Sequence, residues 1–305
     1  MEELLAVAEK IKRLEIQGAS NVAKTGIKAF ANYINSLSDE EELMPYILKA
    51  NDILFNARET EPALWNSLKL IIKKVKKSGL TRGIGLKEVV SQVVDFYFNR
   101  IKNATSEIGK IGARRIVDNM IIMTHCHSTA AERILIEAWN DNKDIKVICT
   151  ETRPKFQGRI TAKILTEVGI PVTMVVDSAM RWVLKNKNVD MIITGADAIT
   201  SEGTVLNKIG SRLLALAAAE SHVPYYIATP LFKYDPETIV GHLTKIELRE
   251  PEEIWIKEEG RPKNLQFENP AFETISREYI AGLITEVGIF ASEQIGLMFE
   301  KYYEI

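Results

Sequence analysis

Cysteine is scarce in this chain, and neither sign of charge is in clear excess. Cys126 and Cys149 are the only cysteines among 305 residues, which is too few for a disulfide framework and is typical of the reducing cytosol. The 39 Lys and Arg against 41 Asp and Glu give a formal net charge of -2. No overall positive field therefore favours nucleic acid or an anionic membrane, and we expect any anionic ligand to be held by local groups.

Long apolar runs are also lacking. No run approaches the roughly 18 residues that a transmembrane helix needs. The first residues, MEELLAVAEKIKRLEIQG, mix acidic and basic residues at helical spacing, whereas a signal peptide has a basic start before an apolar core. We therefore expect a cytoplasmic protein that does not bind a membrane.

Two different apolar patterns divide the chain. The first part repeats apolar residues at intervals of three and four, as in LLAVAEKIKRL and VVSQVVDFYFNRI, which predicts amphipathic helices. From about Val117, short apolar runs alternate with amphipathic helices; the runs are MIIMT, KVICT, VTMVV, MIIT and YYIAT. This alternation predicts a parallel sheet flanked by helices. We expect an α/β protein with a helical domain at residues 1–115 and a parallel-sheet domain at residues 116–305.

Three other segments allow more limited predictions. TRGIG, residues 81–85, is expected to be a loop, and the polar stretch 249–269 is expected to wrap the surface. Near the end of the chain, ITEVGIF predicts one more strand before a terminal helix.

The loop after the first predicted strand contains Cys126. It lies just before a helix in which Thr129 and Glu132 have the spacing of a capping box. Unpaired amides and the helix dipole at such an N-terminus favour a thiolate, which predicts a thiol usable as an acid or base near neutral pH. From position alone, an inert buried cysteine is the alternative.

His125 and His127 flank this cysteine but do not predict a metal site. The other histidines, His222 and His242, are distant in the sequence, and no paired cysteine spacing is present. We therefore expect neither a metal nor an organic cofactor.

The loop after the fourth predicted strand contains Asp197. Gly195 in the same TGAD segment allows close approach of the backbone. Ligands of open parallel sheets bind beyond the carboxyl ends of the strands, so Asp197 is expected to face the same crevice as Cys126. A partly desolvated carboxyl group there could act as a general acid, and a turn-forming aspartate is the alternative.

Further polar residues recur at the ends of predicted strands. They are Glu151, Thr152, Arg153, Gln157, Asn207, Lys208 and Lys233. Cations beside helix N-termini can form a phosphate cradle. The chain contains neither GxxxxGK[ST] nor GxGxxG, which argues against a nucleoside triphosphatase and against a standard dinucleotide enzyme.

Five segments in this order, THCHS, ETRPKFQGRITA, TGADAI, VLNKIG and FKYD, resemble one known family. That family unites the regulatory subunits of translation initiation factor 2B with isomerases of methylthioribose 1-phosphate and of ribose 1,5-bisphosphate. The resemblance covers nearly the whole chain and implies a helical domain followed by a Rossmann-like one. It also implies that Cys126 and Asp197 are catalytic residues of an enzyme, because regulatory subunits commonly lack this pair.

The resemblance implies a set of substrate contacts as well. These are Gln17, Gly18, Ala19, Ser20 and Arg58 in the helical domain, and Asn207, Lys208 and Lys233 further along the chain. The isomerases usually have an arginine where this chain has Gln17. Backbone amides and the Ser20 hydroxyl would then have to hold the anion without that charge.

The expected substrate is ribose 1,5-bisphosphate, because QGRITAKILTEVGIPVTMVVDSA and NPAFETISREYIAGLITEVGIF are similar to the archaeal isomerases of this compound. The implied reaction converts alpha-D-ribose 1,5-bisphosphate into D-ribulose 1,5-bisphosphate, in nucleoside and AMP degradation. Two alternatives stay open: a non-catalytic alpha-type subunit of an initiation factor 2B-like complex, and a methylthioribose 1-phosphate isomerase. The resemblance further implies a homo-oligomer, either a dimer or a hexamer, and makes AMP the effector to test.

Overall fold

The chain folds into two compact units. The computed structural model describes residues 1–13, 15–16, 18–58, 61–241 and 246–303. The helical unit comprises residues 1–103 with 232–234 and Tyr303, and the sheet unit comprises residues 104–231 and 235–302. The division falls within helix α5 (Gly83–Ala113). The expected domain boundary at residue 115 lies just beyond this helix and stays a prediction.

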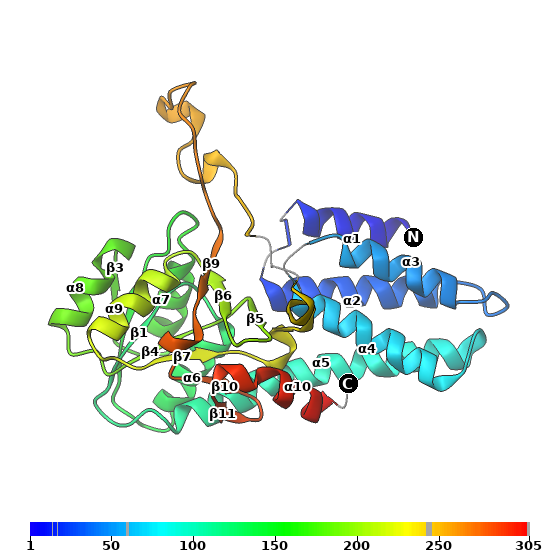
Figure 1. The fold of residues 1–305 in the computed structure, drawn as a ribbon, viewed down its shortest axis with the longest axis horizontal. Coiled ribbons are helices and arrows are strands. Elements are labelled where there is room, and N and C mark those ends of the chain that lie inside the picture. The colour runs from blue at the N-terminus through cyan, green and yellow to red at the C-terminus, as the bar shows by residue number, and fades with distance from the viewer. Residues whose placement is uncertain (14, 17, 59–60, 242–245, 304–305) are drawn as a thin grey trace. The chain divides into compact units, whose positions relative to one another are not determined.

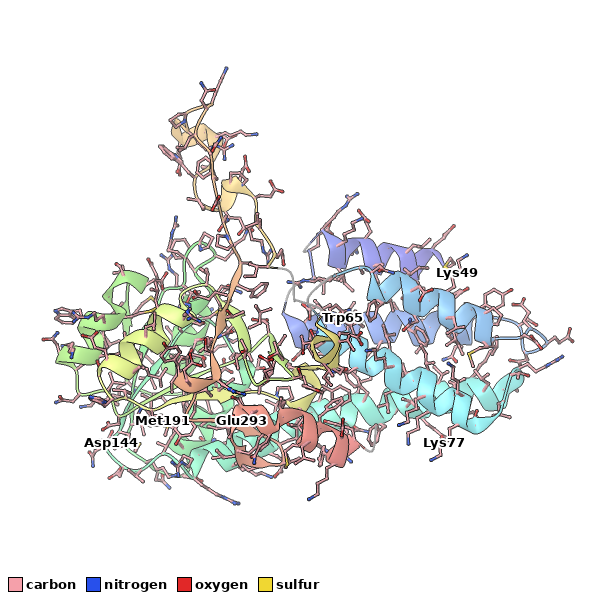
Figure 2. All side chains as sticks on the ribbon, in the orientation of Figure 1. Lys49, Trp65, Lys77, Asp144, Met191 and Glu293 are labelled. Carbon is pink, nitrogen blue, oxygen red and sulfur yellow. The ribbon has the colours of Figure 1, made fainter. Side chains whose placement is uncertain are left out.

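The helical unit contains the amphipathic helices that the sequence predicts. They are α1 (Glu2–Lys12), α2 (Ala19–Asn35), α3 (Met44–Phe55), α4 (Pro62–Ser78) and the first part of α5 (Figure 1). Their apolar stripes form the core, in which Leu4, Phe30 and Leu64 are fully buried. Trp65 of α4, labelled in Figure 2, stacks on Phe55 of α3. Helix α5 begins at Gly83, so the expectation that residues 81–85 form a loop is wrong for their second half.

A short segment from late in the chain belongs to the helical unit. The side-chain amide of Asn66 donates hydrogen bonds to the carbonyl oxygens of Phe232 at 2.9 Å and of Tyr234 at 2.7 Å. The ring of Phe232 also packs edge-on against Tyr97. These contacts fix the backbone on both sides of Lys233.

The sheet unit is built on a mainly parallel sheet. Within the described ranges, seven strands have the order β11-β10-β7-β4-β1-β2-β3. Their bounds are β1 (Ile121–Thr124), β2 (Lys146–Thr150), β3 (Val172–Val175), β4 (Met191–Thr194), β7 (Tyr225–Ala228), β10 (Gly282–Thr285) and β11 (Gly288–Phe290). The five apolar runs of the sequence are β1, β2, β3, β4 and β7, so the predicted parallel sheet is confirmed.

The end of the sheet differs from the expectation. ITEVGIF was expected to form one strand, but it forms parts of two antiparallel strands, β10 and β11. Thr285 pairs with Gly288 across a tight turn, where Gly288 has a φ of 138° that L side chains rarely adopt. The single-strand prediction is therefore wrong.

Helices flank the parallel sheet, as the alternating pattern predicts. They are α6 (Thr129–Asn140), α7 (Gln157–Glu167), α8 (Met180–Asn186) and α9 (Ser211–Glu220). The terminal helix that the sequence predicts is confirmed as α10 (Ile295–Tyr303). Ile134 of α6 and Leu165 of α7 pack with Ile122, Val147 and Ile193 of the strands in one apolar core. Among the helices of the described residues, none has both the length and the apolar character that a membrane span requires.

A second, small sheet lies in the same unit and was not predicted. Strand β6 (Val205–Lys208) pairs antiparallel with β5 (Ala198–Thr200) on one side and with β9 (Phe272–Ile275) on the other. A two-residue strand, β8, spans Tyr234–Asp235. Strand β6 contains Asn207 and Lys208, so this small sheet positions two of the expected site residues.

Residues 246–270 form an arm of the sheet unit. Figure 1 shows the arm, in orange, extending away from the sheets of this unit. Leu248 pairs with Pro270 at its base, and the backbone N–H of Arg249 donates to the carbonyl oxygen of Asn269 at 2.8 Å. The expectation that this stretch wraps the surface is therefore wrong.

Candidate active site

Cys126 and Asp197 follow neighbouring strands of the parallel sheet. Cys126 lies after β1 and Asp197 after β4, and these strands pair in parallel. Parallel strands end at the same edge, so both loops lie there. Gly195 allows the loops to approach closely, since a Cβ at this position would lie 2.5 Å from the Ser128 hydroxyl oxygen. The sheet unit thus brings the expected thiol and carboxyl group to one edge.

The helix after Cys126 starts one residue earlier than the capping-box spacing predicts. Ser128 is the N-cap of α6, and its hydroxyl oxygen accepts a hydrogen bond from the N–H of Ala131 at 3.3 Å. The prediction that Thr129 caps this helix is therefore wrong. Cys126 lies two residues before the cap, with a left-handed φ of 66°.

Burial dominates the acid–base chemistry of Cys126. The residue is 9% exposed, and this desolvation raises the pKa of its thiol to about 11. The Lys208 ammonium and the His127 backbone amide lower the pKa, whereas the carboxylates of Asp197 and Asp177 raise it further. The expectation of a thiolate favoured by the helix N-terminus is wrong, because burial outweighs the nearby positive groups. The thiol is neutral near pH 7.

Lys208 is held against an aromatic ring beside this site. Its side chain is almost completely buried, and Nζ lies 4.9 Å from the ring centroid of Phe272. The two residues are direct partners in the β6–β9 ladder. Because Lys208 lowers the pKa of Cys126, its ammonium acts on the thiol electrostatically as well as being an expected phosphate ligand.

Replacing Lys208 by Met is expected to raise the pKa of Cys126 further. A rise of about one pKa unit would lower the thiolate fraction below pH 10 about tenfold. The rate of Cys126 alkylation by iodoacetamide between pH 8 and pH 10 measures this, with peptide masses separating Cys126 from Cys149. Lys163→Met on α7 is the matched control, because Lys163 is an exposed lysine paired with Glu167. Equal rates in Lys208→Met and the wild type would contradict the assigned charge effect.

The side-chain amide of Asn207 has a fixed orientation. Its Nδ2 donates to the hydroxyl oxygen of Ser211 at 3.0 Å, while the Ser211 hydroxyl donates to the carbonyl oxygen of Lys208 at 2.6 Å. The hydroxyl proton of Ser211 is used in the bond to Lys208, so the Ser211 oxygen can only accept a hydrogen bond from the Asn207 amide. Asn207 is thus held by the start of α9, next to Lys208 in the chain.

Gln157 approaches the thiol from the first turn of α7. Its side-chain oxygen lies 3.6 Å from the sulfur of Cys126 and can accept the thiol proton in a hydrogen bond. The start of α7 can lie this close to the end of β2 only because residue 158 is glycine. A Cβ at this position would lie 1.8 Å from the carbonyl oxygen of Thr150. The sequence indicates Gln157 only as one of several polar residues at strand ends.

The other expected substrate contacts belong to the helical unit. Gly18 is the N-cap of α2 with a φ of 83°, and Ser20 is part of the first turn of that helix, after Ala19. Arg58 is buried and forms an ion pair with Glu61 at 2.8 Å. Lys233, the remaining contact, lies in the segment held by Asn66, whereas Gln17 lies outside the described residues. The roles of these residues in substrate binding stay predictions.

The two histidines of the THCHS segment have hydrogen-bonding partners. Nδ1 of His125 lies 2.6 Å from the Thr150 hydroxyl oxygen, and Nε2 lies 2.9 Å from the carbonyl oxygen of Ile209. Nδ1 of His127 lies 3.1 Å from the hydroxyl oxygen of Thr161. No cluster of three or more His, Cys, Asp or Glu that could hold a metal ion occurs within the described part of the chain.

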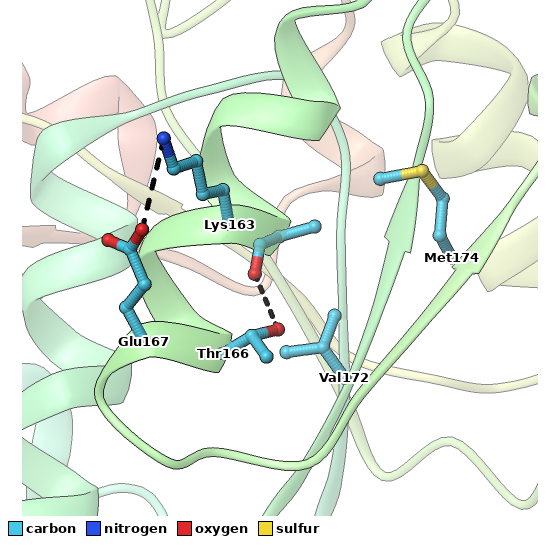
Figure 3. A pocket seen from close by; sticks show the side chains of 6 residues that line it. Lys163, Thr166, Glu167, Val172 and Met174 are labelled. Carbon is cyan, nitrogen blue, oxygen red and sulfur yellow. Dashed lines mark hydrogen bonds and ion pairs between the residues drawn. The ribbon is translucent and has the colours of Figure 1, made fainter.

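A separate groove lies at the edge of the parallel sheet. Its volume is about 580 Å³, and its walls are Ala162, Lys163, Thr166, Glu167, Val172 and Met174 (Figure 3). These residues come from the C-terminal part of α7 and from β3, whereas Gln157 is at the opposite end of α7. None of the expected site residues lines this groove.

The fold and the site define an α/β protein with a thiol and a carboxyl group at the carboxyl edge of a parallel sheet, beside a buried lysine. Residues 15–292 match the Initiation factor 2 subunit family, and the chain belongs to this family.

Three known proteins that are similar to this chain are named for different functions. A ribose 1,5-bisphosphate isomerase of Methanocaldococcus jannaschii is 41% identical over 97% of this chain and 94% of its own length. A methylthioribose-1-phosphate isomerase of Acetivibrio thermocellus is 30% identical over 95% of this chain and 88% of its own length. The crystal structure of translation initiation factor eIF-2B from Pyrococcus horikoshii OT3 has a TM-score of 0.81 at 28% identity, covering 95% of this chain and 98% of that chain.

Proposed function

We propose that this protein is an aldose–ketose isomerase that converts ribose 1,5-bisphosphate into ribulose 1,5-bisphosphate. The relative named for this reaction shares 41% of its residues with the chain over nearly the full length, against 30% for the methylthioribose relative. The observation that carries the proposal is the convergence of Cys126, Asp197 and Lys208 at one edge of the sheet. A base, an acid and a cation are the groups that the isomerisation of a sugar phosphate requires.

The first step opens the sugar ring. Asp197, in its protonated form, donates a proton to the ring oxygen while the bond between this oxygen and carbon 1 breaks. The phosphate stays on carbon 1, and the former ring oxygen becomes the hydroxyl of carbon 4. Asp197 is half-buried in the short loop between β4 and β5, at the edge where ligands of open parallel sheets bind.

The second step moves a proton between neighbouring carbons. The Cys126 thiolate removes the proton from carbon 2, which gives an enol phosphate, and then returns a proton to carbon 1. The hydroxyl proton of carbon 2 passes to the Asp197 carboxylate as the ketone forms. Atoms and charges balance, and both groups end the cycle as they began.

The cycle requires the thiolate form of Cys126. Burial raises the pKa of this thiol to about 11, so the thiol holds its proton near pH 7. The working form needs one proton on Asp197 and none on Cys126. The thiol must therefore lose its proton before it acts as the base, and the Lys208 ammonium is the nearby charge that favours this loss.

Purified protein incubated with ribose 1,5-bisphosphate tests the proposal directly. We expect ribulose 1,5-bisphosphate as the product, and no comparable conversion of methylthioribose 1-phosphate. Preference for the methylthio compound would favour the second isomerase, whereas turnover of neither compound would contradict the proposal. Repeating the assay with AMP tests whether this nucleotide is an effector.

A regulatory subunit of an initiation factor 2B-like complex is the second candidate. The similarity to the Pyrococcus horikoshii structure named for that factor favours it. Capture of initiation factor 2 by the purified protein, without turnover of either sugar phosphate, would support this candidate. We also propose that the protein is a homo-oligomer in the cytoplasm; size-exclusion chromatography with light scattering distinguishes a dimer or hexamer from a monomer.

A further inference from the structure

The backbone of Cys126 is held from both sides by threonine hydroxyls. Its N–H donates to the hydroxyl oxygen of Thr152 at 2.9 Å, and its carbonyl oxygen accepts from the Thr161 hydroxyl at 3.1 Å. Cys126 has a φ of 66°, which is uncommon for a residue other than glycine. Two specific hydrogen bonds therefore stabilise the unusual conformation from which the thiol projects.

Thr152 is itself held in an unfavourable conformation. Its φ is 61°, although β-branched residues rarely adopt the left-handed region, and its side chain is fully buried. The carboxylate of Asp177 accepts the backbone N–H groups of Thr152 at 2.8 Å and of Arg153 at 2.7 Å. Asp177 thus fixes the turn that presents the Thr152 hydroxyl to Cys126.

A chain of hydrogen bonds sets the direction of the Thr152 hydroxyl. Nε2 of His125 faces the carbonyl oxygen of Ile209, so Nε2 carries the proton and Nδ1 accepts from the hydroxyl of Thr150. The hydroxyl proton of Thr150 is used in that bond to His125. The hydroxyl oxygen of Thr150 lies 3.4 Å from that of Thr152, so it can only accept the proton of the Thr152 hydroxyl. The Thr152 oxygen is left to accept the N–H of Cys126. His125 therefore links the cysteine loop to the segment that follows Lys208.

We propose that Thr152 and Thr161 are positioning residues for the Cys126 thiol, with Asp177 and His125 holding Thr152 in place. Thr152 and Thr161 bond to the backbone of Cys126, and these two hydrogen bonds are named the clamp. The clamp does not require either threonine to touch the sugar phosphate. Its effect on turnover rests on the proposed isomerase function, because a fixed thiol affects the rate only if the thiol must meet a carbon atom in a fixed geometry.

Thr152→Val tests the clamp, because valine keeps the shape of the side chain and removes the hydroxyl. We expect kcat to fall about 100-fold with little change in KM, since a misplaced reacting group costs rate more than binding. Thr152→Ser restores the hydroxyl and is expected to return kcat to within about threefold of the wild type. Thr229→Val is the matched control, since Thr229 is an equally buried threonine of the sheet unit whose hydroxyl faces the carbonyl oxygen of Pro230.

Alkylation of Cys126 by iodoacetamide provides a readout that does not depend on the substrate. A released loop exposes the buried thiol, so Thr152→Val is expected to react about fivefold faster or more, whereas Thr152→Ser and Thr229→Val react like the wild type. A wild-type kcat or a wild-type alkylation rate in Thr152→Val overturns the proposal, and so does an equal loss of kcat in Thr152→Ser.

Circular dichroism and thermal unfolding establish that each variant is folded. If Thr152→Val does not fold, Thr161→Val is used in its place. The same fall in kcat and the same faster alkylation are expected, and a wild-type value of either would overturn the proposal. If the wild type converts no ribose 1,5-bisphosphate, the proposed function fails. The alkylation rates then still decide whether the clamp holds the thiol.

Discussion

Removal of the Cys126 thiol is expected to lower kcat for ribose 1,5-bisphosphate about 1,000-fold or more, because one group performs both proton transfers at carbon. Cys126→Ala is the variant, and kcat and KM are measured from the appearance of ribulose 1,5-bisphosphate. KM is expected to change little, since residues other than Cys126 are proposed to hold the phosphates. Cys126 lies in a loop rather than in the strand core, so the fold should be retained.

Cys149→Ala is the matched control for this experiment. Cys149 is buried in β2 and packs in the apolar core of the sheet unit, where its pKa is raised by burial alone. Its removal should lower the thermal stability without removing activity. Substantial turnover by folded Cys126→Ala would exclude the thiol as the catalytic base.

Asp197→Asn is expected to cause a loss of similar size, about 1,000-fold in kcat, because an amide cannot protonate the ring oxygen. Substrate binding should persist, and isothermal titration with ribose 1,5-bisphosphate measures this separately from turnover. The combination of retained binding and lost turnover is what assigns the carboxyl group to the chemical step.

Asp144→Asn serves as the control for the loss of a carboxylate. Asp144, labelled in Figure 2, is an exposed residue of the loop before β2, and its backbone N–H donates to the carboxylate of Asp118. This variant is expected to have wild-type kinetics. If Asp197→Asn retained most of its kcat, ring opening would require a different acid and the proposed cycle would be wrong.

The main sheet could be predicted from the sequence because its central strands, such as β4 and β7, are fully buried. The strand MIIT is apolar up to its final threonine, since helices cover both faces of a parallel sheet. The hairpin of β10 and β11 was missed because ITEVGIF contains no conventional turn dipeptide. The small sheet was missed for another reason: β6 and β9 are short strands, and the residues that pair lie far apart in the chain.

The position of the candidate site was predictable, but its energetics were not. Cys126 and Asp197 could be placed because each follows a strand of the parallel sheet. The direction of the thiol pKa was mistaken, because a helix N-terminus can be read locally whereas burial depends on segments distant in the sequence. The same limit hides the clamp, since threonines and aspartates at strand ends are common and only the fold brings Thr152 to Cys126.

In the proposed cycle a thiol carries a proton between carbon 2 and carbon 1. Turnover in deuterated water, continued through repeated forward and reverse reaction, distinguishes this proton transfer from a hydride shift. Solvent deuterium is expected to accumulate at carbon 1 of ribulose 1,5-bisphosphate, as detected by NMR, because the proton rests on an exchangeable sulfur during each cycle. Carbon 1 that stays free of deuterium while ribulose 1,5-bisphosphate accumulates would indicate a hydride shift and contradict the role of Cys126.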